Sequence, residues 1–300
     1  MQARLTAFPP DSAALAQVIV TGDAVRIGRA ADSTLRIDHP SISRAHAELC
    51  IDDAGVRMRD LGSKNGSFMD GTAVTDARLD GPCWLRFGDV FCEFLPLGAA
   101  DVSADQAGRQ ARRAAATAHT ARIESVLQLD DLLDATLRGV LDLAQCDRGF
   151  VLLDAPDGYR VRASIALEPS DLGSRRFSGS VGAVDRALQS RRSVIANDIG
   201  QQAWLASRAS VAAAGLSALA CLPLLDGDRA IGAVYADRTR PGPPITALDL
   251  ELLEAFVERA ALWICARRAT DALATEADTS AHWSHVVDAQ AGNMPIPPAA

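Results

Sequence analysis

The sequence of 300 residues lacks the short motifs that mark the common classes of enzyme. It has no GxxxxGK[ST] nucleotide loop, no HRD or DFG set, no HExxH zinc motif and no GxSxG serine motif. No helix-turn-helix signal is visible either. These absences predict a non-enzymatic protein with no catalytic residues and no bound metal.

Histidine is scarce, and none occurs between His119 and His282. This gap excludes a histidine-ligated haem or a histidine metal site from that part of the chain. His282 and His285 have the spacing of one helical turn, but no third ligand is near them in the sequence. We interpret the pair as coincidental.

Basic side chains are outnumbered by acidic ones, and the net charge is -8 at pH 7. This balance argues against a nucleic-acid partner, because binding to a phosphate backbone needs clustered Lys and Arg. The longest apolar stretch, residues 211–225, is interrupted by Ser217 and Pro223 and is too short to insert across a membrane. The six cysteines are dispersed without a CxxC pair, and no signal-peptide pattern is visible. We therefore expect reduced thiols and a cytoplasmic location.

Three loops between residues 26 and 71 carry side chains suited to a phosphate dianion. The loops contribute, in chain order, Gly28 with Arg29, Ser43 with Arg44, and Ser63, Lys64 and Asn65 ahead of Gly66. Short apolar runs separate them, and similar runs on either side alternate apolar and polar residues. Strands and polar turns at this spacing predict a β-sandwich whose loops gather at one end.

The chemistry of these loops fits a phosphate, but each pair of residues is weak on its own. A guanidinium offers a planar fork of donors, a serine hydroxyl adds a short donor, and an asparagine amide can hold a neighbouring backbone. Against this, Gly-Arg, Ser-Arg and Asn-Gly pairs are common in ordinary turns. Asn65-Gly66 in particular is typical of a tight hairpin.

The combination is far less common than its parts. The pair GR, then SRxHA with its Ser fourteen residues after that Arg, then SxNG in a third loop, together resemble the forkhead-associated (FHA) domain. FHA domains are β-sandwiches that bind phosphothreonine peptides, and the resemblance covers about residues 1 to 97. The Gly88-Asp89 pair is expected to form a hairpin in this sandwich, with Trp84, Phe87, Phe91 and Phe94 in its core or at its edge.

The resemblance implies a role for each loop residue. Arg29 and Ser43 would contact the phosphate, and Asn65 would hold the peptide backbone. The implied phosphopeptide-binding set also includes Arg44, Ser63 and Lys64, while the implied structural set is Gly28, His46 and Gly66. The sequence departs from the family at Ser67, where Thr is usual, and at Asp70, where Asn is usual. Neither departure touches the implied phosphate contacts.

Residues 98–120 have no large apolar side chain beyond Val102, so we interpret them as a linker. Its Ala- and Arg-rich second half is compatible with a helix. Arg109, Arg112 and Arg113 are interpreted as a solvated helix face rather than an anion site.

The following segment predicts helices alternating with strands. Periodicity and turn signals predict helices at 123–146, 181–189, 204–214 and from Thr246 to Ala266 or beyond, and strands at 149–153, 161–166, 194–196, 219–225 and 230–236. Thr246 with Asp249 is typical of a capping box. This order describes an α+β domain with one antiparallel sheet.

Residues 121 to 268 are similar to a GAF domain, a small-molecule-sensing and dimerising relative of the PAS fold. The similar segments are RGFVLLD at 148–154, VIAND at 194–198, SALACLPLLDGDRAIGAVYADR at 217–238 and the helix TALDLELLEAFVERAALWI. The Cys-His pair of bilin-binding relatives and the signature of cyclic-nucleotide-binding relatives are not visible. An unidentified small ligand, or no cofactor at all, remains open for this domain.

The apolar stripe of residues 248–264 is wider than one sheet face needs. It favours a homodimer through a helical bundle, and the alternative is a helix buried within one chain. Residues 269–300 are expected to be a flexible tail. Because Thr275 has Asp278 three residues on, we hypothesise that Thr275 or Thr279 is phosphorylated and occupies a phosphopeptide site.

These patterns predict a multidomain signalling adaptor or regulator. Its first domain would bind a phosphothreonine-bearing protein, either a serine/threonine kinase or a substrate of one. The second would dimerise the chain or sense a small ligand. The alternative is a small-molecule-sensing or redox-active GAF protein of the sulfoxide reductase type with the FHA domain as a scaffold, which would require Cys146, Cys221 and Cys265 around one pocket.

Overall fold

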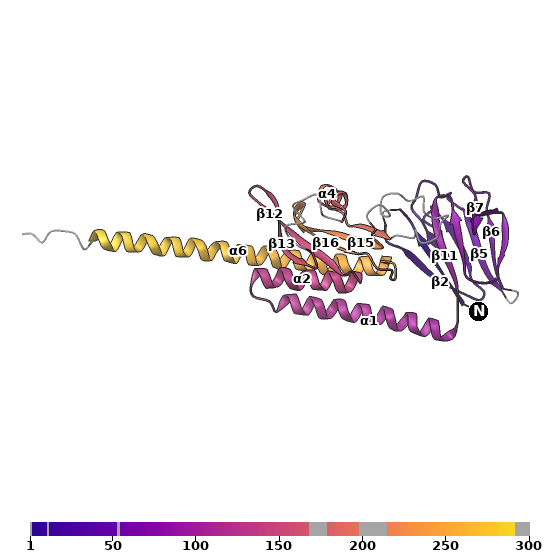
Figure 1. Cartoon of the computed structure of the whole chain (residues 1–300), viewed down its shortest axis with the longest axis horizontal. Coiled ribbons are helices and arrows are strands. Elements are labelled where there is room, and N and C mark those ends of the chain that lie inside the picture. Colours follow the sequence, from indigo (N-terminus) through magenta and orange to yellow (C-terminus); the bar gives the residue numbers. More distant parts are fainter. Residues whose placement is uncertain (1, 11, 53–54, 168–178, 198–214, 292–300) are drawn as a thin grey trace, which may run out of the picture.

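The computed structural model describes residues 2–10, 12–52, 55–167, 179–197 and 215–291. A β-sandwich is followed by a long helix, an α+β domain and a final helix that extends well past that domain (Figure 1). Within these residues no helix is long and apolar enough to cross a membrane.

The N-terminal sandwich consists of two sheets. The first has the order β2-β1-β11-β10-β7-β8 and the second the order β4-β3-β5-β6-β9. The strands of the first sheet are β1 (Gln2–Phe8), β2 (Leu15–Val20), β7 (Ser67–Met69), β8 (Thr72–Val74), β10 (Cys83–Phe87) and β11 (Val90–Leu97). Those of the second are β3 (Ala24–Gly28), β4 (Leu35–Arg36), β5 (Ala47–Asp52), β6 (Gly55–Asp60) and β9 (Asp76–Leu79).

Alternation along these strands fills the space between the two sheets. Leu5, Ile27, Leu49, Met58 and Phe94 all have no exposed surface, whereas most of their neighbours in the strands are partly or fully exposed. The Gly88-Asp89 hairpin joins β10 to β11 as predicted. The predicted aromatic core is confirmed, since Phe87 and Phe94 are fully buried.

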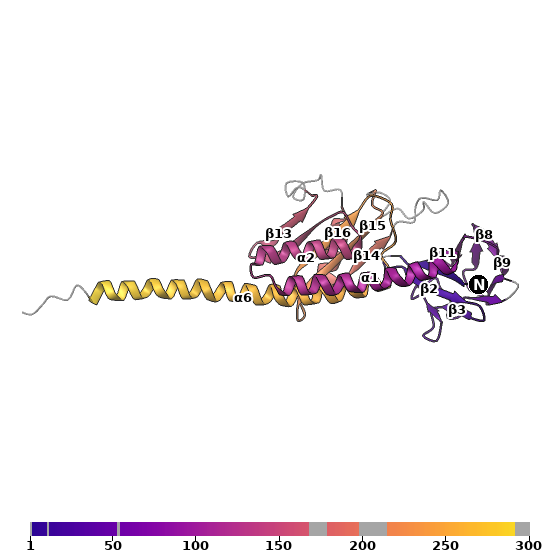
Figure 2. The ribbon, with the colours of Figure 1, turned by 90° about the horizontal axis from the view of Figure 1, so that it is seen from below.

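The α+β domain is built on one antiparallel sheet of order β13-β12-β16-β15-β14. Its strands are β12 (Arg148–Ala155), β13 (Gly158–Ile165), β14 (Val194–Asn197), β15 (Ala218–Asp226) and β16 (Arg229–Arg238). Helix α4 (Val181–Ser190) covers one face. On the other face lie α1 (Ala99–Glu124), α2 (Leu129–Ala144) and α6 (Ala247–Ala291). Figure 2 shows α1 and α6 side by side across this face.

Two helical predictions need correction. The segment predicted as a linker at 98–120 is helix α1, which buries Ala116 and Ile123 against the other helices. The single helix predicted over 123–146 is interrupted at 125–128, because Gln128 is extended and caps α2, and Leu127 is 72% exposed in the turn. Residues 98–120 were interpreted as a linker because they contain few large apolar side chains, but their Ala and Arg residues are good helix formers and continue as helix α1.

The C-terminal prediction also changes. Residues 269–291, expected to belong to a flexible tail, continue α6 without interruption. The capping box at the start of α6 is confirmed, because Asp249 Oδ2 accepts a hydrogen bond from the Thr246 N–H at 2.8 Å. The helix predicted at 204–214 lies outside the described residues, as do residues 292–300.

Candidate functional site

The three predicted loops meet at one end of the sandwich. They follow β3, precede β5 and join β6 to β7. The Arg29 N–H donates to the Ser43 carbonyl at 2.9 Å, which joins the first loop to the second. The Lys64 N–H donates to Ser43 Oγ at 3.0 Å, which joins the second to the third. The structure therefore brings together residues that are separated by up to 35 positions in the sequence.

Gly28 is required by the close approach of the first two loops. A Cβ atom at this position would lie 2.1 Å from the Arg44 carbonyl oxygen and 2.7 Å from Ser33 Oγ. No side chain fits there without moving the backbone. The implied structural role of Gly28 therefore has a direct geometric cause.

His46 is buried and forms hydrogen bonds to the second and third loops. It has no exposed surface, its Nδ1 accepts from the Ser43 N–H at 3.1 Å, and its Nε2 donates to the Gly66 carbonyl at 3.1 Å. This pattern requires the neutral imidazole with its proton on Nε2. Burial lowers the pKa of His46 from its ordinary value of 6.5, against the opposing effects of the Gly66 carbonyl and Asp60.

Asp60, which the sequence analysis missed, organises the third loop. Its carboxylate accepts from Ser63 Oγ at 2.7 Å, from Ser67 Oγ at 2.5 Å and from the Gly62 N–H at 2.9 Å. Burial alone would raise the pKa of Asp60, but these hydrogen bonds hold it below its usual value. An Asp with Ser three residues later is a known loop-forming pattern, so a signal was present.

Ser63 and Asn65 also form hydrogen bonds that hold the loop cluster together. The Ser63 hydroxyl donates its proton to Asp60 and accepts from the Gly66 N–H at 3.0 Å. Asn65 Nδ2 donates to the Ser41 carbonyl at 2.8 Å, and no described residue donates to its Oδ1. The Asn65-Gly66 pair is not a hairpin, because β6 and β7 lie in different sheets. The hairpin interpretation of this pair is therefore wrong.

Ser41 is the second residue that sequence reasoning missed. Its hydroxyl accepts from the Asp89 N–H at 2.9 Å and bonds with His39 Nδ1 at 2.8 Å. These contacts join the loop after β4 to the β10–β11 hairpin. Its partners Asn65 and Asp89 are 24 and 48 residues away, so no local pattern could have identified it.

Three cations surround this loop cluster without a carboxylate partner. Arg29, Arg44 and Lys64 are exposed, and among the described residues none of them forms an ion pair. Lys64 is also the only lysine in the chain. Most other arginines of the sandwich have an acidic neighbour, and these are Arg4, Arg26, Arg36, Arg57, Arg59 and Arg78. The loop end therefore presents three exposed cations without ion-pair partners on an acidic chain.

The two departures from the usual FHA pattern retain structural contacts. Ser67 keeps a hydroxyl that bonds to Asp60. Asp70 adopts a φ of 46° in the β7–β8 turn, and its Oδ1 accepts from the Trp84 N–H at 3.0 Å. Asp70-Gly71 is a hairpin signal that the sequence analysis overlooked, and β7 and β8 were missed with it.

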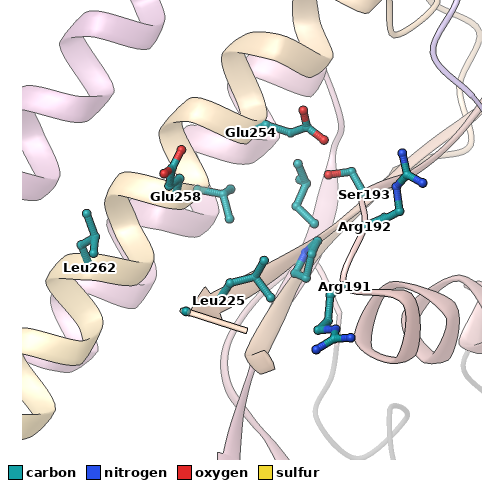
Figure 3. A pocket seen from close by; sticks show the side chains of 11 residues that line it. Arg191, Arg192, Ser193, Leu225, Glu254, Glu258 and Leu262 are labelled. Carbon is teal, nitrogen blue, oxygen red and sulfur yellow. The ribbon is translucent and has the colours of Figure 1, made fainter. Parts of the chain in front are cut away.

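A second candidate site is a groove of about 420 Å³ beside α6 in the α+β domain. Figure 3 shows α6 forming one wall and the turn between α4 and β14 forming the other. Glu254 and Glu258 face it from the helix, while Arg191 and Arg192 stand at the turn. In the described part of the chain these four side chains form no ion pair. Leu262, at the edge of the groove, is 60% exposed.

The opposite sheet face holds a polar cluster whose members bond to one another. Tyr235 Oη donates to Asp237 Oδ2 at 2.7 Å, and Arg148 Nε donates to Asp237 Oδ1 at 2.5 Å. The Ser180 N–H donates to Tyr235 Oη at 3.0 Å. Burial raises the pKa of Tyr235, and the Asp237 charge adds to this. The cluster joins the start of α4 to the sheet.

The thiols required for a redox site are not gathered in one place. Cys146 packs in the cluster under the helices, whereas Cys221 packs on the opposite sheet face beside Tyr235. Burial raises the pKa of each to about 12. Cys265 is half-buried on α6, and its pKa is also raised by burial. Thiols in this state are poor nucleophiles, which argues against the reductase alternative.

Comparison with known families gives two matches along the chain. Residues 25–92 match the family model of the FHA domain, and residues 128–264 match that of the GAF domain. The chain thus carries an FHA domain followed by a GAF domain. Strands β1 and β2 lie outside the matched FHA range but pair in the same sheet. No curated protein matches the chain.

Solved structures are similar to one half or the other. The FHA domain of CT664 from Chlamydia trachomatis is 22% identical over 33% of this chain and 100% of that chain, with a TM-score of 0.31. An FHA domain from a study of phosphothreonine-dependent interactions is 23% identical over 32% and 98%, with a TM-score of 0.29. A GAF domain/HD domain protein from Geobacter sulfurreducens is 19% identical over 49% and 98%, with a TM-score of 0.37.

Proposed function

We propose that this chain, in which an FHA domain is followed by a GAF domain, is a non-enzymatic signalling adaptor or regulator that binds phosphothreonine-containing partners. The FHA loops bind the phosphorylated segment, and the GAF half dimerises the chain. A dimer presents two phosphopeptide sites on one body, which raises the effective concentration for the second contact.

The observation that carries the proposal is the group of three exposed cations at the loop end. A phosphothreonine side chain carries about -1.5 to -2 charges at pH 7, which three cations can neutralise. All three cations are next to Ser43. Arg29 and Lys64 each donate a backbone N–H to Ser43, and Arg44 follows Ser43 in the chain. We assign the phosphate contacts to Arg29 and Ser43 and assign Arg44 and Lys64 to charge neutralisation.

Asn65 is suited to hold the peptide main chain. Because its Nδ2 is bound to Ser41, the amide plane is fixed and Oδ1 is left to accept a peptide N–H. Ser63 supports the loop through Asp60 rather than by contact with the peptide. The partner is a protein phosphorylated on threonine, either a serine/threonine kinase or its substrate, in the cytoplasm, where the six free cysteines stay reduced.

The test is fluorescence anisotropy with a degenerate phosphothreonine peptide pool beside phosphoserine and unphosphorylated pools. We expect binding confined to phosphothreonine. Arg29→Ala removes a charge-assisted hydrogen bond of about 1.5 to 3 kcal/mol, so affinity should fall about 10- to 150-fold. Arg36→Ala is the matched control, because Arg36 is equally cationic but pairs with Asp38. Binding that is indifferent to phosphate and to Arg29 would contradict the proposal.

The dimer is proposed from the outer surface of α6. Leu262 and Leu273 are 60% and 67% exposed, and eleven residues place them on nearly the same side of a helix. The helix also extends beyond its own domain (Figures 1 and 2). Isolated helices are marginal in water, so a second α6 packed along this side would stabilise the extension.

A further inference from the structure

The loop between β1 and β2 of the FHA domain is built into the start of α6. Ala13 is 2% exposed and packs in the hydrophobic cluster of the GAF domain, and Ala14 has no exposed surface. The Ala14 N–H donates to the Ile245 carbonyl at 2.9 Å, and the Ala247 N–H donates to the Ala14 carbonyl at 2.8 Å. These bonds form a short parallel bridge between Ala14 and Thr246. The first turn of α6 is therefore ordered partly by the other domain.

The same turn is also held by the GAF sheet and by α1. Asn197 at the end of β14 bonds to both backbone groups of Ile245, at 3.1 and 2.8 Å. Arg112 of α1 lies 3.3 Å from Asp249 Oδ1, and the Asp249 side chain is 4% exposed. The prediction of a solvated arginine face on α1 is thus wrong at Arg112. The β1–β2 loop, the GAF sheet and α1 therefore all contact the start of α6.

The β1–β2 loop lies at the same end of the sandwich as the phosphopeptide loops. Phe8 at the end of β1 pairs with Phe91 on β11, and Phe8, Ala14 and Phe91 form one buried cluster with Trp84 beside it. Phe91 follows the Gly88-Asp89 turn by two residues. In that turn the Gly88 N–H donates to the Gly66 carbonyl at 3.1 Å.

A continuous series of packed contacts thus runs from the third phosphopeptide loop to the GAF helix. It passes from Gly66 to the Gly88-Asp89 turn, then through the Phe91 cluster to Ala14 and the first turn of α6. The steps are hydrogen bonds and buried contacts, except that the turn is joined to Phe91 by the chain of β11 itself. Densely packed groups of this kind have low compressibility and transmit strain to one another.

We infer that the β1–β2 loop couples the phosphopeptide site to the start of α6, so that a bound phosphopeptide stabilises the first turn of this helix. The inference rests on the proposed function for its ligand. Coupling of this kind is reciprocal, so loosening the contact at Ala13 and Ala14 also weakens phosphopeptide binding. Partner binding at one domain would then alter the helix through which the other domain dimerises.

Hydrogen exchange measured by mass spectrometry on the full chain tests this inference. Ala13→Glu places a charge in the buried contact, and Ser12→Glu places the same charge one residue earlier at an exposed position of the same loop. Without ligand, Ala13→Glu should accelerate exchange about tenfold or more at Ala247 to Leu250 and also at Gly88 and Asp89. Ser12→Glu should change neither. Acceleration at α6 without any change at Gly88 and Asp89 would show that the loop is only an anchor.

The second arm adds a saturating phosphothreonine peptide. In the wild type and Ser12→Glu, exchange should slow at Gly66 and Gly88 and also at residues 247–250. In Ala13→Glu it should slow only at the loops. Protection of the loops without protection of residues 247–250 in the wild type would overturn the coupling and leave the proposed function intact. No protection of the loops at any peptide concentration would overturn the proposed function, and the ligand-free arm then decides the coupling. Ala13→Leu supplies a milder lesion if Ala13→Glu fails to fold.

Discussion

His46 is the residue at which pH and loop structure meet. Protonation of Nδ1 would convert the acceptor of the Ser43 N–H into a donor and break the contact beneath the phosphate loops. Because burial lowers the pKa of His46 in the folded state, the unfolded chain binds its proton at higher pH. The stability that neutral His46 contributes is therefore complete above the unfolded pKa of about 6.5 and declines as the pH falls below it.

We predict that His46→Leu loses about 2 to 4 kcal/mol of unfolding free energy at pH 7.5, because it leaves the Ser43 N–H without an acceptor and removes one of the two hydrogen bonds to the Gly66 carbonyl. Urea unfolding between pH 5 and 8 measures this. The wild type should lose stability between pH 6.5 and 5 by an increment that the variant lacks. Parallel pH profiles for the two proteins would contradict the role assigned to His46.

Asp60 gives a second prediction at this scale. Its folded pKa is depressed by hydrogen bonds, so its stabilising effect is present above the unfolded pKa of about 4 and is lost as the pH falls through the folded value. Asp60→Asn should cost about 1 to 3 kcal/mol at pH 7, because an amide cannot accept from Ser63, Ser67 and two backbone N–H groups as a carboxylate does. Thermal unfolding at pH 7 and pH 3 should show a much smaller difference between the two proteins at pH 3.

Residue-scale prediction from the sequence succeeded where a short motif carried the information. Gly28, Ser43 and Lys64 were placed in one loop cluster from their spacing and the FHA resemblance, and the structure brings them together. The contacts of Ser41 with the other loops could not be found, because they span 24 and 48 residues and leave no local pattern. Long-range loop contacts of this kind depend on the register of whole strands.

At the scale of elements, α6 combines a capped start, a buried middle and an exposed outer side. Its first turn is capped by the Thr246 and Asp249 pair, and Leu253, Phe256 and Ile264 pack under the sheet. In the part of α6 whose side chains the structure describes, residues 247–274, the large apolar side chains of Leu262 and Leu273 remain exposed. We therefore assign them to a second copy.

Leu262→Glu and Leu273→Glu together should weaken the dimer at least about 30-fold, equivalent to about 2 kcal/mol, because two charges replace apolar contacts at its centre. Analytical ultracentrifugation over a concentration series measures this. Val181→Glu is the matched control, since Val181 is 58% exposed on α4, away from α6. A wild type that is monomeric at all concentrations, or a double variant that dimerises as well as the control, would contradict the assignment.

The strand pattern was predicted more completely than the helix boundaries. Alternation along β5, β10 and the middle of β11 identifies half-buried strands directly, because successive residues point to opposite faces of the sheet. Helix α1 was interpreted as a linker, because it has few large apolar residues and buries small ones such as Ala116 instead. Composition alone does not reveal that an Ala-rich helix can pack closely against neighbours.

At the scale of the whole molecule, an acidic chain of net charge -8 carries a cluster of cations without ion-pair partners at the loop end of its sandwich. The sequence predicted that phosphate recognition would be local, because the overall charge excludes a broad basic surface. It did not predict how the two domains contact each other. The junction depends on Ala13 and Ala14, small residues whose burial only the folded chain reveals.

The most direct test of the central claim is ³¹P NMR of a phosphothreonine peptide titrated with the full chain between pH 5 and 8. Bound phosphate surrounded by Arg29, Arg44 and Lys64 should stay dianionic at lower pH, so its second pKa should fall below the free value of about 6. Arg29→Ala should return that pKa toward the free value. A ³¹P resonance whose shift and titration are unchanged by the protein would show that the loop cations do not bind phosphate.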